Sequence, residues 1–263
     1  SSAPQSERLI AALKRALTTR GYQPRTITTY TEWIRRFLHF HQHPHPRQLE
    51  HSHIQQFQQY LAGPRRLAAR SRNQAASALT FLYREILDIP TRGLIERSRG
   101  QSRHIPVVLS VHEVERLLQE MRGRKRSCAS LMYGTGLRIS EALSLRLKDL
   151  DFDLDRITVR DGKGGKGRVV MLPRALRQEL KHLAHKRSQR HSADRRSGHG
   201  WAALPHALDK RYPRAGYDLG WQFLFDARKI SRDPATDRRG RAPLHTTAMQ
   251  RAVKRAVRQA GLT

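Results

Sequence analysis

The sequence predicts a mainly α-helical fold with a small β-hairpin or sheet (α+β), divided into two domains. Apolar residues recur at helical spacing through most of the chain. One glycine-rich reversal, DGKGGKG, separates two segments rich in β-branched residues, which is typical of a hairpin. Residues 90–105 contain proline, glycine and four arginines without an apolar period. We therefore expect domains at 1–90 and 106–263, joined by a basic linker at 91–105.

The first domain is predicted to be a bundle of four helices. The first helix opens at Ser6, carries Leu9, Leu13 and Leu17 on one face and closes at Gly21. The other three are expected over about 26–40, 49–61 and 71–87; Pro44 and Pro46 follow the first of these, and Gly63-Pro64 follows the second. Many basic residues fall outside the apolar faces, so the bundle can pack a core and still present basic helix faces at its surface.

The second domain is predicted to open with a capped helix. Ser110 is the expected N-cap with Glu113 at the third helical position, and the expected buried stripe is Val111, Val114, Leu117, Leu118 and Met121. The strands are expected at Arg156–Arg160 and Arg168–Leu172. Further helices are expected at about 125–133 (ending at Gly134), at 138–145, from Pro173 to about Lys186, and around Met249–Val257. Residues 187–200 are interpreted as an exposed, mobile loop.

The charge of the chain predicts a polyanionic partner. Lys and Arg outnumber Asp and Glu by 51 to 22, which gives a net charge of +29. A folded state with this excess repels itself unless a polyanion neutralises it, and nucleic acid is the first candidate. A merely basic protein from a GC-rich genome, in which Arg replaces Lys, is the alternative interpretation.

The sequence gives no sign of a metal ion, another cofactor or a membrane span. Cys128 is the single cysteine, which excludes an internal disulfide and a Cys-based zinc site. The histidine-rich run HFHQHPHP at 39–46 lacks a paired set of ligands and is interpreted as a solvated turn. No apolar run reaches about 18 residues, so no membrane span is expected. The first residues, SSAPQSERLI, carry no secretory signal, and with no internal disulfide a cytoplasmic location is expected by default.

Two short motifs could hold a phosphate. In YGTGLRISEALSLRLKDLDFD (133–153), a Gly-Thr-Gly turn delivers Arg138 to the start of a helix, and Glu141 lies within reach to orient it. A purely structural arginine is an equal alternative. Lys163 and Lys166 lie in the glycine-rich turn, where a lysine can reach a leaving group and donate a proton, although a solvated turn is the common alternative. The turn lacks the spacing of a nucleotide-binding P-loop.

In combination, GTGLRISE, LKDLDFD and GKGGKGR resemble the first half of a tyrosine recombinase catalytic domain. The resemblance implies that Arg138 grips the scissile phosphate and that Lys163 is the general acid for the leaving 5′ oxygen. The stretches TITTYTEWIRRFLHFH and SALTFLYREIL are similar to the helical, SAM-like core-binding domain of that family, which clamps DNA. The family forms tetramers on paired sites, and bacterial DNA is the implied partner.

A narrower resemblance is to integron integrases, which capture gene cassettes. LPHALDKRYPRAG (204–216), followed by Trp221 and Asp233-Pro234, is similar to the insertion that marks this subfamily, here at about 201–221. There the insertion holds bases that stick out of a folded single-stranded site, and bases of this kind need aromatic surfaces and positive charge. The residues expected to contact DNA are Trp201, Lys210, Arg211, Tyr212, Arg214, Trp221, Lys166 and Arg168, with Tyr217 as a further aromatic. The alternative is that the aromatics cover the core, which we prefer for Phe223 and Phe225; for Trp221 the two are equal.

Two departures from the family pattern limit the expected activity. Residues 241–245 read Arg-Ala-Pro-Leu-His where integron integrases usually carry adjacent histidines, which leaves His245 as a weak substitute. The family's H-x-L-R-H and L-G-H segments and its nucleophilic tyrosine do not occur, and none of the seven tyrosines has the nucleophile's context. We therefore expect a C-terminally truncated chain that binds folded single-stranded and duplex sites without cleaving them. The alternatives are a non-catalytic, sequence-tolerant DNA-binding protein and a helix-turn-helix regulator, which would need a dimer.

Overall fold

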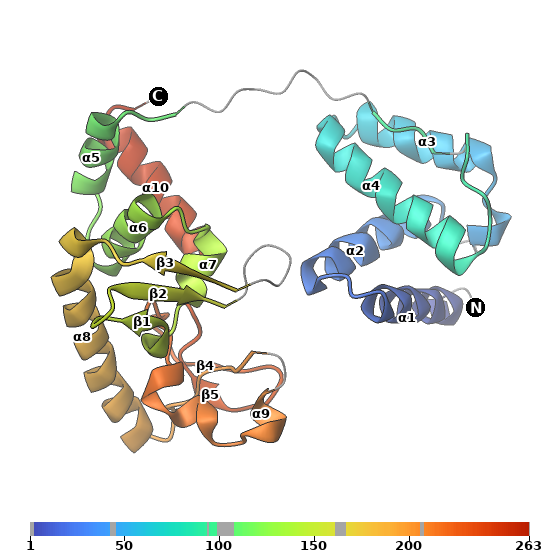
Figure 1. Cartoon of the computed structure of the whole chain (residues 1–263). Helices are drawn as coiled ribbons and strands as arrows, with labels where there is room; N and C mark the ends of the chain where they lie inside the picture. Colours follow the sequence, from blue (N-terminus) through green and yellow to red (C-terminus); the bar gives the residue numbers. More distant parts are fainter. Residues whose placement is uncertain are drawn as a thin grey trace. The chain divides into compact units, whose positions relative to one another are not determined.

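The computed structural model describes residues 3–42, 46–93, 95–98, 108–160, 167–205 and 208–262. These residues form helices and two small antiparallel sheets, so the predicted fold class is confirmed (Figure 1). The chain divides into two compact units, Ser1–Pro106 and Val107–Thr263. None of the helices in the described ranges is long and apolar enough to cross a membrane.

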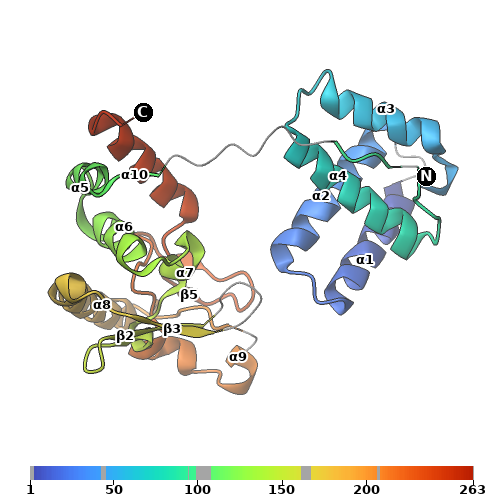
Figure 2. The same cartoon turned by 45° about the horizontal axis from the view of Figure 1, so that its top comes forward.

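The first unit is a helical bundle. Its elements are α1 (Ala3–Thr19), α2 (Pro24–Phe40), α3 (His51–Ala62) and α4 (Ala69–Phe81), and a π-helical turn at Leu82–Ile86 continues α4. Helix α2 packs against both α1 and α4 (Figure 2). Leu13, Leu17, Ile34 and Phe37 are fully buried in the shared core. The four predicted helices are confirmed, because each carries the apolar face that its spacing indicated.

The second unit is built around a three-stranded antiparallel sheet. Strands β1 (Leu150–Asp151), β2 (Arg156–Val159) and β3 (Arg168–Met171) lie in that order, and Ile157 and Val159 of β2 are buried in the core. The predicted hairpin is confirmed. Strand β1 was not predicted, because two residues within the charged run KDLDFD show no alternating pattern.

Helices and a second small sheet complete this unit. They are α5 (Val111–Gln119), α6 (Gly123–Thr135), α7 (Ile139–Ser144), α8 (Arg177–Arg196), α9 (Leu208–Arg211), α10 (Thr246–Gln259) and the paired strands β4 (Ser231–Arg232) and β5 (Arg239–Gly240). The capping box at the start of α5 is confirmed, since Ser110 Oγ accepts from the Glu113 N–H and the Ser110 N–H donates to Glu113 Oε2.

Two local predictions in this unit were wrong. Val111 is 58% exposed, because the first residue of α5 points to solvent while Leu117 and Met121 face the core. Helix α6 does not end at Gly134 but runs to Thr135, and Gly136 caps it at φ +67°. That left-handed conformation favours glycine, so the turn before Arg138 is built by the second glycine of the Gly-Thr-Gly motif.

The prediction of an exposed loop at 187–200 was also wrong for most of its length. Helix α8 continues to Arg196, and Figure 1 shows it running from the level of the three-stranded sheet to that of β4 and β5. Arg187, His191 and Asp194 are buried along its inner face. The inner stripe of this half is polar, so the apolar period that predicts an amphipathic helix is missing.

Candidate functional site

One buried carboxylate holds two arginines side by side. Arg138 is the N-cap residue of α7, and Arg168 is the first residue of β3. Glu141 Oε1 accepts hydrogen bonds from Nη1 of Arg138 and Nη1 of Arg168, both at 2.8 Å. Glu141 Oε2 accepts from the Arg138 backbone N–H at 2.9 Å and from Arg168 Nη2 at 2.8 Å. The carboxylate therefore fixes two guanidinium groups from distant parts of the chain.

This arrangement presents a positive charge to solvent. The Glu141 side chain is 2% exposed, whereas those of Arg138 and Arg168 are 55% and 36% exposed. The hydrogen bonds from Arg168, and then those from Arg138, lower the pKa of Glu141 to about 2. Two permanent cations and one carboxylate leave one net positive charge, which suits a singly charged phosphodiester.

The sequence assigns two lysines to the turn between β2 and β3. Lys163 and Lys166 lie outside the described residues. The strands on either side are described, and Val159 of β2 pairs with Arg168 of β3. The predicted roles of both lysines therefore stay predictions.

Four exposed residues of the predicted insertion form a basic and aromatic surface. Lys210 and Arg211 lie in α9, and Tyr212 and Arg214 follow it. Tyr212 is 51% exposed, and the Arg211 guanidinium carbon lies 5.4 Å from its ring centroid. We call Lys210, Arg211, Tyr212 and Arg214 the insertion surface. It offers a flat ring and three positive charges to a ligand.

The prediction that Trp201 offers a stacking surface to a base was wrong. Its side chain is 1% exposed, and its indole N–H donates to Asp233 Oδ2 at 2.9 Å. The Arg238 guanidinium covers the ring at 4.3 Å. A Cβ at Gly216 would lie 2.3 Å from the ring, so the backbone packs directly on the indole. Trp201 is therefore a core residue of the second unit.

Trp221 is half-buried and already in contact with cations. Lys148 Nζ lies 2.7 Å from its ring centroid, and the Arg146 and Arg160 guanidinium carbons lie at 5.2 and 5.8 Å. Burial, followed by repulsion from Arg160, lowers the pKa of Lys148. A base could stack on the covered face only if Lys148 moved away. The predicted core residues Phe223 and Phe225 are buried.

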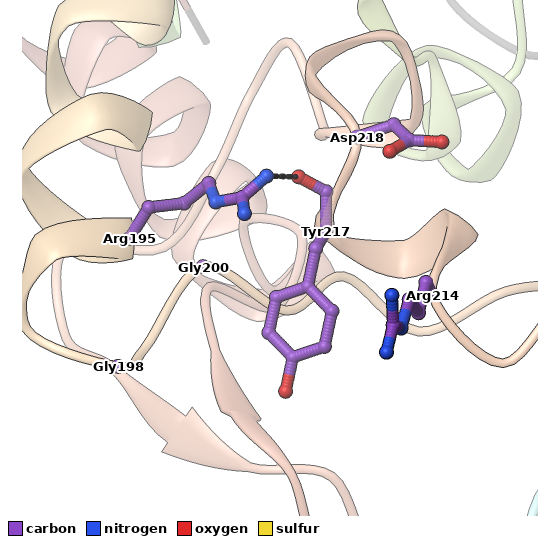
Figure 3. A pocket seen from close by; sticks show the side chains of 6 residues that line it. All are labelled: Arg195, Gly198, Gly200, Arg214, Tyr217 and Asp218. Carbon is purple, nitrogen blue, oxygen red and sulfur yellow. Dashed lines mark hydrogen bonds between the residues drawn. The ribbon is translucent and has the colours of Figure 1, made fainter.

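A pocket of about 410 Å³ opens between the end of α8 and the segment at 214–218 (Figure 3). It is lined by Arg195, Gly198, Gly200, Arg214, Tyr217 and Asp218. Arg195 Nη1 donates to the Tyr217 carbonyl at 3.3 Å, which leaves the tyrosine ring as one wall. A Cβ at Gly200 would lie 2.5 Å from Arg195 Cγ, so the glycine makes room for this contact.

Sequence reasoning missed a buried ionic network that joins Asp226 and Arg241 to helices α6 and α8. Asp226 is fully buried and accepts from Arg124 Nη1 at 2.8 Å and Arg190 Nη2 at 2.9 Å. Asp194 accepts from Nε and Nη2 of Arg241 at 2.6 and 2.8 Å. The one feature of the sequence that could have indicated this network was the helical spacing of the polar positions 187, 191 and 194. Among the described residues, no three His, Cys, Asp or Glu side chains gather as a metal site.

Two family patterns together match most of the chain. Residues 9–92 match the phage integrase N-terminal SAM-like domain, and residues 107–263 match the phage integrase family. An "Integrase/recombinase" of Escherichia coli and one of Pseudomonas aeruginosa are each 40% identical over 261 residues. In both cases the match covers 98% of this chain and 77% of the relative.

Solved structures of recombinases have a similar fold. A λ integrase tetramer bound to a Holliday junction matches with a TM-score of 0.61 at 14% identity, over 98% of this chain and 64% of that chain. XerH recombinase bound to palindromic difH matches with a TM-score of 0.59 at 19% identity, over 98% of this chain and 68% of that chain. At such low identity these matches bear on the fold alone.

Proposed function

We propose that this chain, which belongs to the phage integrase family of tyrosine recombinases, binds recombination-site DNA as an integron-type integrase. Its preferred substrate is a folded single strand with extruded bases. The observation that carries this proposal is the insertion surface, where a half-exposed tyrosine stands among three exposed cations. Extruded bases need a ring to stack on and charge to hold the backbone.

The proposed role of the Arg138–Glu141–Arg168 arrangement is to hold the scissile phosphate. Glu141 fixes Arg138 by two hydrogen bonds, so its guanidinium is oriented before DNA arrives. In the family reaction a tyrosine oxygen attacks the phosphorus, the bond to the 5′ oxygen breaks, and the lysine matching Lys163 protonates that oxygen. This scheme needs no external energy source, because the phosphodiester energy is kept in the covalent link. It needs no metal ion or other cofactor, because side chains such as Arg138 stabilise the charge of the transition state.

A comparison of two matched hairpins tests the substrate preference. One hairpin carries extruded bases, and in the other the same bases are paired; affinities are measured in a gel shift at one salt concentration. We expect tighter binding to the first, and Tyr212→Ala should lower that preference, since stacking contributes about 1–3 kcal/mol per base. Leu154→Ala is the control, because Leu154 is 57% exposed but lies in the β1–β2 turn. Equal affinity of the wild-type chain for both hairpins would remove the integron assignment.

We also propose that a polypeptide of these 263 residues binds DNA without cleaving it. None of its seven tyrosines stands in the nucleophile context of the family. A nicked hairpin substrate should therefore yield no protein–DNA adduct that survives boiling in detergent. Detection of such an adduct would contradict the proposal and would locate the nucleophile by peptide mapping.

The proposed assembly follows the family. We infer that the partners are folded single-stranded and duplex recombination sites in the bacterial cytoplasm, with a tetramer as the synaptic form. If the chain instead bound unrelated duplexes as tightly as these sites, a sequence-tolerant DNA-binding protein would be the better description.

A further inference from the structure

The first unit contains a groove of about 420 Å³ between α2, α3 and the segment that follows α3. Its walls include Trp33, Arg36, Phe40, Phe57, Tyr60 and Arg65. Among the described residues that line it, none is acidic. We propose that this groove, which we call the α2–α3 groove, holds one unpaired nucleotide of the bound DNA. The proposal rests on the DNA binding proposed above but not on the insertion surface.

The aromatic side chains form a continuous surface in this groove. The rings of Phe40 and Tyr60 stack with centroids 4.6 Å apart and an interplanar angle of 28°. Phe57 lies 5.5 Å from Phe40 and 6.4 Å from Tyr60. Phe57 is buried, whereas Phe40 and Tyr60 stay partly exposed. Every base has a π-face, so an aromatic surface of this kind accepts any base that has left its stack.

Two exposed arginines supply charge for the phosphate. The Arg36 guanidinium carbon lies 4.9 Å from the Trp33 ring centroid. Arg65 is brought to the groove because the chain folds back after α3. Its N–H donates to the Tyr60 carbonyl at 3.1 Å, and the Leu67 N–H donates to the Leu61 carbonyl at 2.9 Å. These backbone hydrogen bonds hold the segment after α3 in place, and the segment positions the Arg65 cation beside the aromatic rings of the groove.

The shape of the groove distinguishes a single nucleotide from a duplex. A volume of this size falls within the range of about 300–1,000 Å³ that encloses small molecules. Duplex DNA is read by an element that protrudes into its groove, whereas a recess can receive only a base that has left the helix. The positive lining and the family's action on DNA favour a nucleotide over an acidic peptide or a second copy of the chain.

Matched charge variants of the whole chain test this inference. The probes are a short unstructured oligothymidine strand and a perfect duplex, with binding followed by fluorescence anisotropy. We expect Arg36→Ala/Arg65→Ala to lower single-strand affinity about tenfold and duplex affinity much less. The control Arg15→Ala/Arg35→Ala removes the same charge from exposed positions outside the groove and should weaken both probes slightly. Tyr60→Leu keeps apolar packing and should also lower single-strand affinity.

Cross-linking provides a second readout that does not depend on variant stability. A strand containing bromodeoxyuridine should cross-link under ultraviolet light to peptides that contain Trp33 or Tyr60. If the groove variants bind the strand as the control does, and no such cross-link forms, the inference is overturned. If the groove variants no longer self-associated but kept the strand affinity of the wild-type chain, the groove would be a protein interface instead. If the wild-type chain binds neither probe, the DNA-binding proposal itself fails.

Discussion

At the scale of single residues, Glu141 links the chemistry of the candidate site to the stability of the fold. A carboxylate whose pKa is lowered from 4.5 to about 2 stabilises the folded state fully above pH 4.5. That contribution is lost as the pH falls from about 4.5 towards 2. Glu141→Gln should therefore lower the free energy of unfolding at pH 7 by up to about 3 kcal/mol.

Urea unfolding at pH 7, 4 and 3 checks this prediction. The difference in the free energy of unfolding between wild type and Glu141→Gln should shrink as the pH falls. Protonation neutralises the Glu141 carboxylate in the wild type, and the substitution has already removed that negative charge in the variant. A difference that stayed constant with pH would show that Glu141 acts through packing alone.

Asp226 gives a second prediction at this scale. Its carboxylate is fully buried, with Arg124 and Arg190 at hydrogen-bond distance and Arg187 Nε at 3.5 Å. Asp226→Asn removes the carboxylate that these three guanidinium groups share and should cost about 3–5 kcal/mol of unfolding free energy. Asp237→Asn is the control, because Asp237 is 75% exposed in its pair with Arg232 and should contribute at most about 1 kcal/mol. Similar losses in urea unfolding for both variants would contradict a structural role of the network.

Residue identity predicted some of these contacts and not others. The spacing of three residues put Glu141 within reach of Arg138, and that pair is present. The bond from Arg168 to the same carboxylate depends on where β3 lies beside α7, which local spacing does not give. Trp201 and Tyr212 also looked alike in the sequence, yet one is 1% and the other 51% exposed. An aromatic side chain suits a core as well as a base, so only the fold separates these two uses.

At the scale of elements, the sequence predicted the helices whose inner stripe is apolar. Helices α1 to α4 and α10 carry such stripes. The second half of α8 does not, because its inner positions hold Arg187, His191 and Asp194. These side chains contact segments far along the chain, such as Gln222, whose Oε1 accepts a hydrogen bond from Arg187 Nη2 at 2.7 Å. Polarity alone therefore indicated a loop where the folded chain has a helix.

A proline substitution distinguishes helix from loop in this region. Ser192 is exposed in α8, and its backbone lies within the helix. Ser192→Pro removes a helical hydrogen bond and clashes with the preceding turn, so it should lower the free energy of unfolding by about 3 kcal/mol or more. Ser192→Ala should be nearly neutral, because the change keeps a good helix former. If both variants unfolded at the same urea concentration, α8 would not extend through this segment.

At the scale of the whole molecule, the distribution of charge connects the fold to DNA binding. Several carboxylates of the second unit are buried in ion pairs with arginine, namely those of Glu141, Asp149, Asp194 and Asp226. The insertion surface and the outer face of α10 keep exposed cations such as Lys210 and Arg251. Internal pairing thus leaves the net charge of +29 concentrated at the surface, where phosphate can reach it.

The last prediction follows from this surplus. Each phosphate neutralised on duplex DNA contributes about −0.9 to the slope of log affinity against log salt. With six or more contacts, affinity should fall about 1,000-fold or more between 50 and 200 mM salt. Arg138→Ala should make the slope shallower by about one contact, whereas Arg232→Ala should leave it unchanged, because Arg232 already pairs with Asp237. Anisotropy titrations at four salt concentrations measure these slopes. An Arg138 variant with the wild-type slope would mean that this guanidinium does not touch phosphate, even though Glu141 holds it in place.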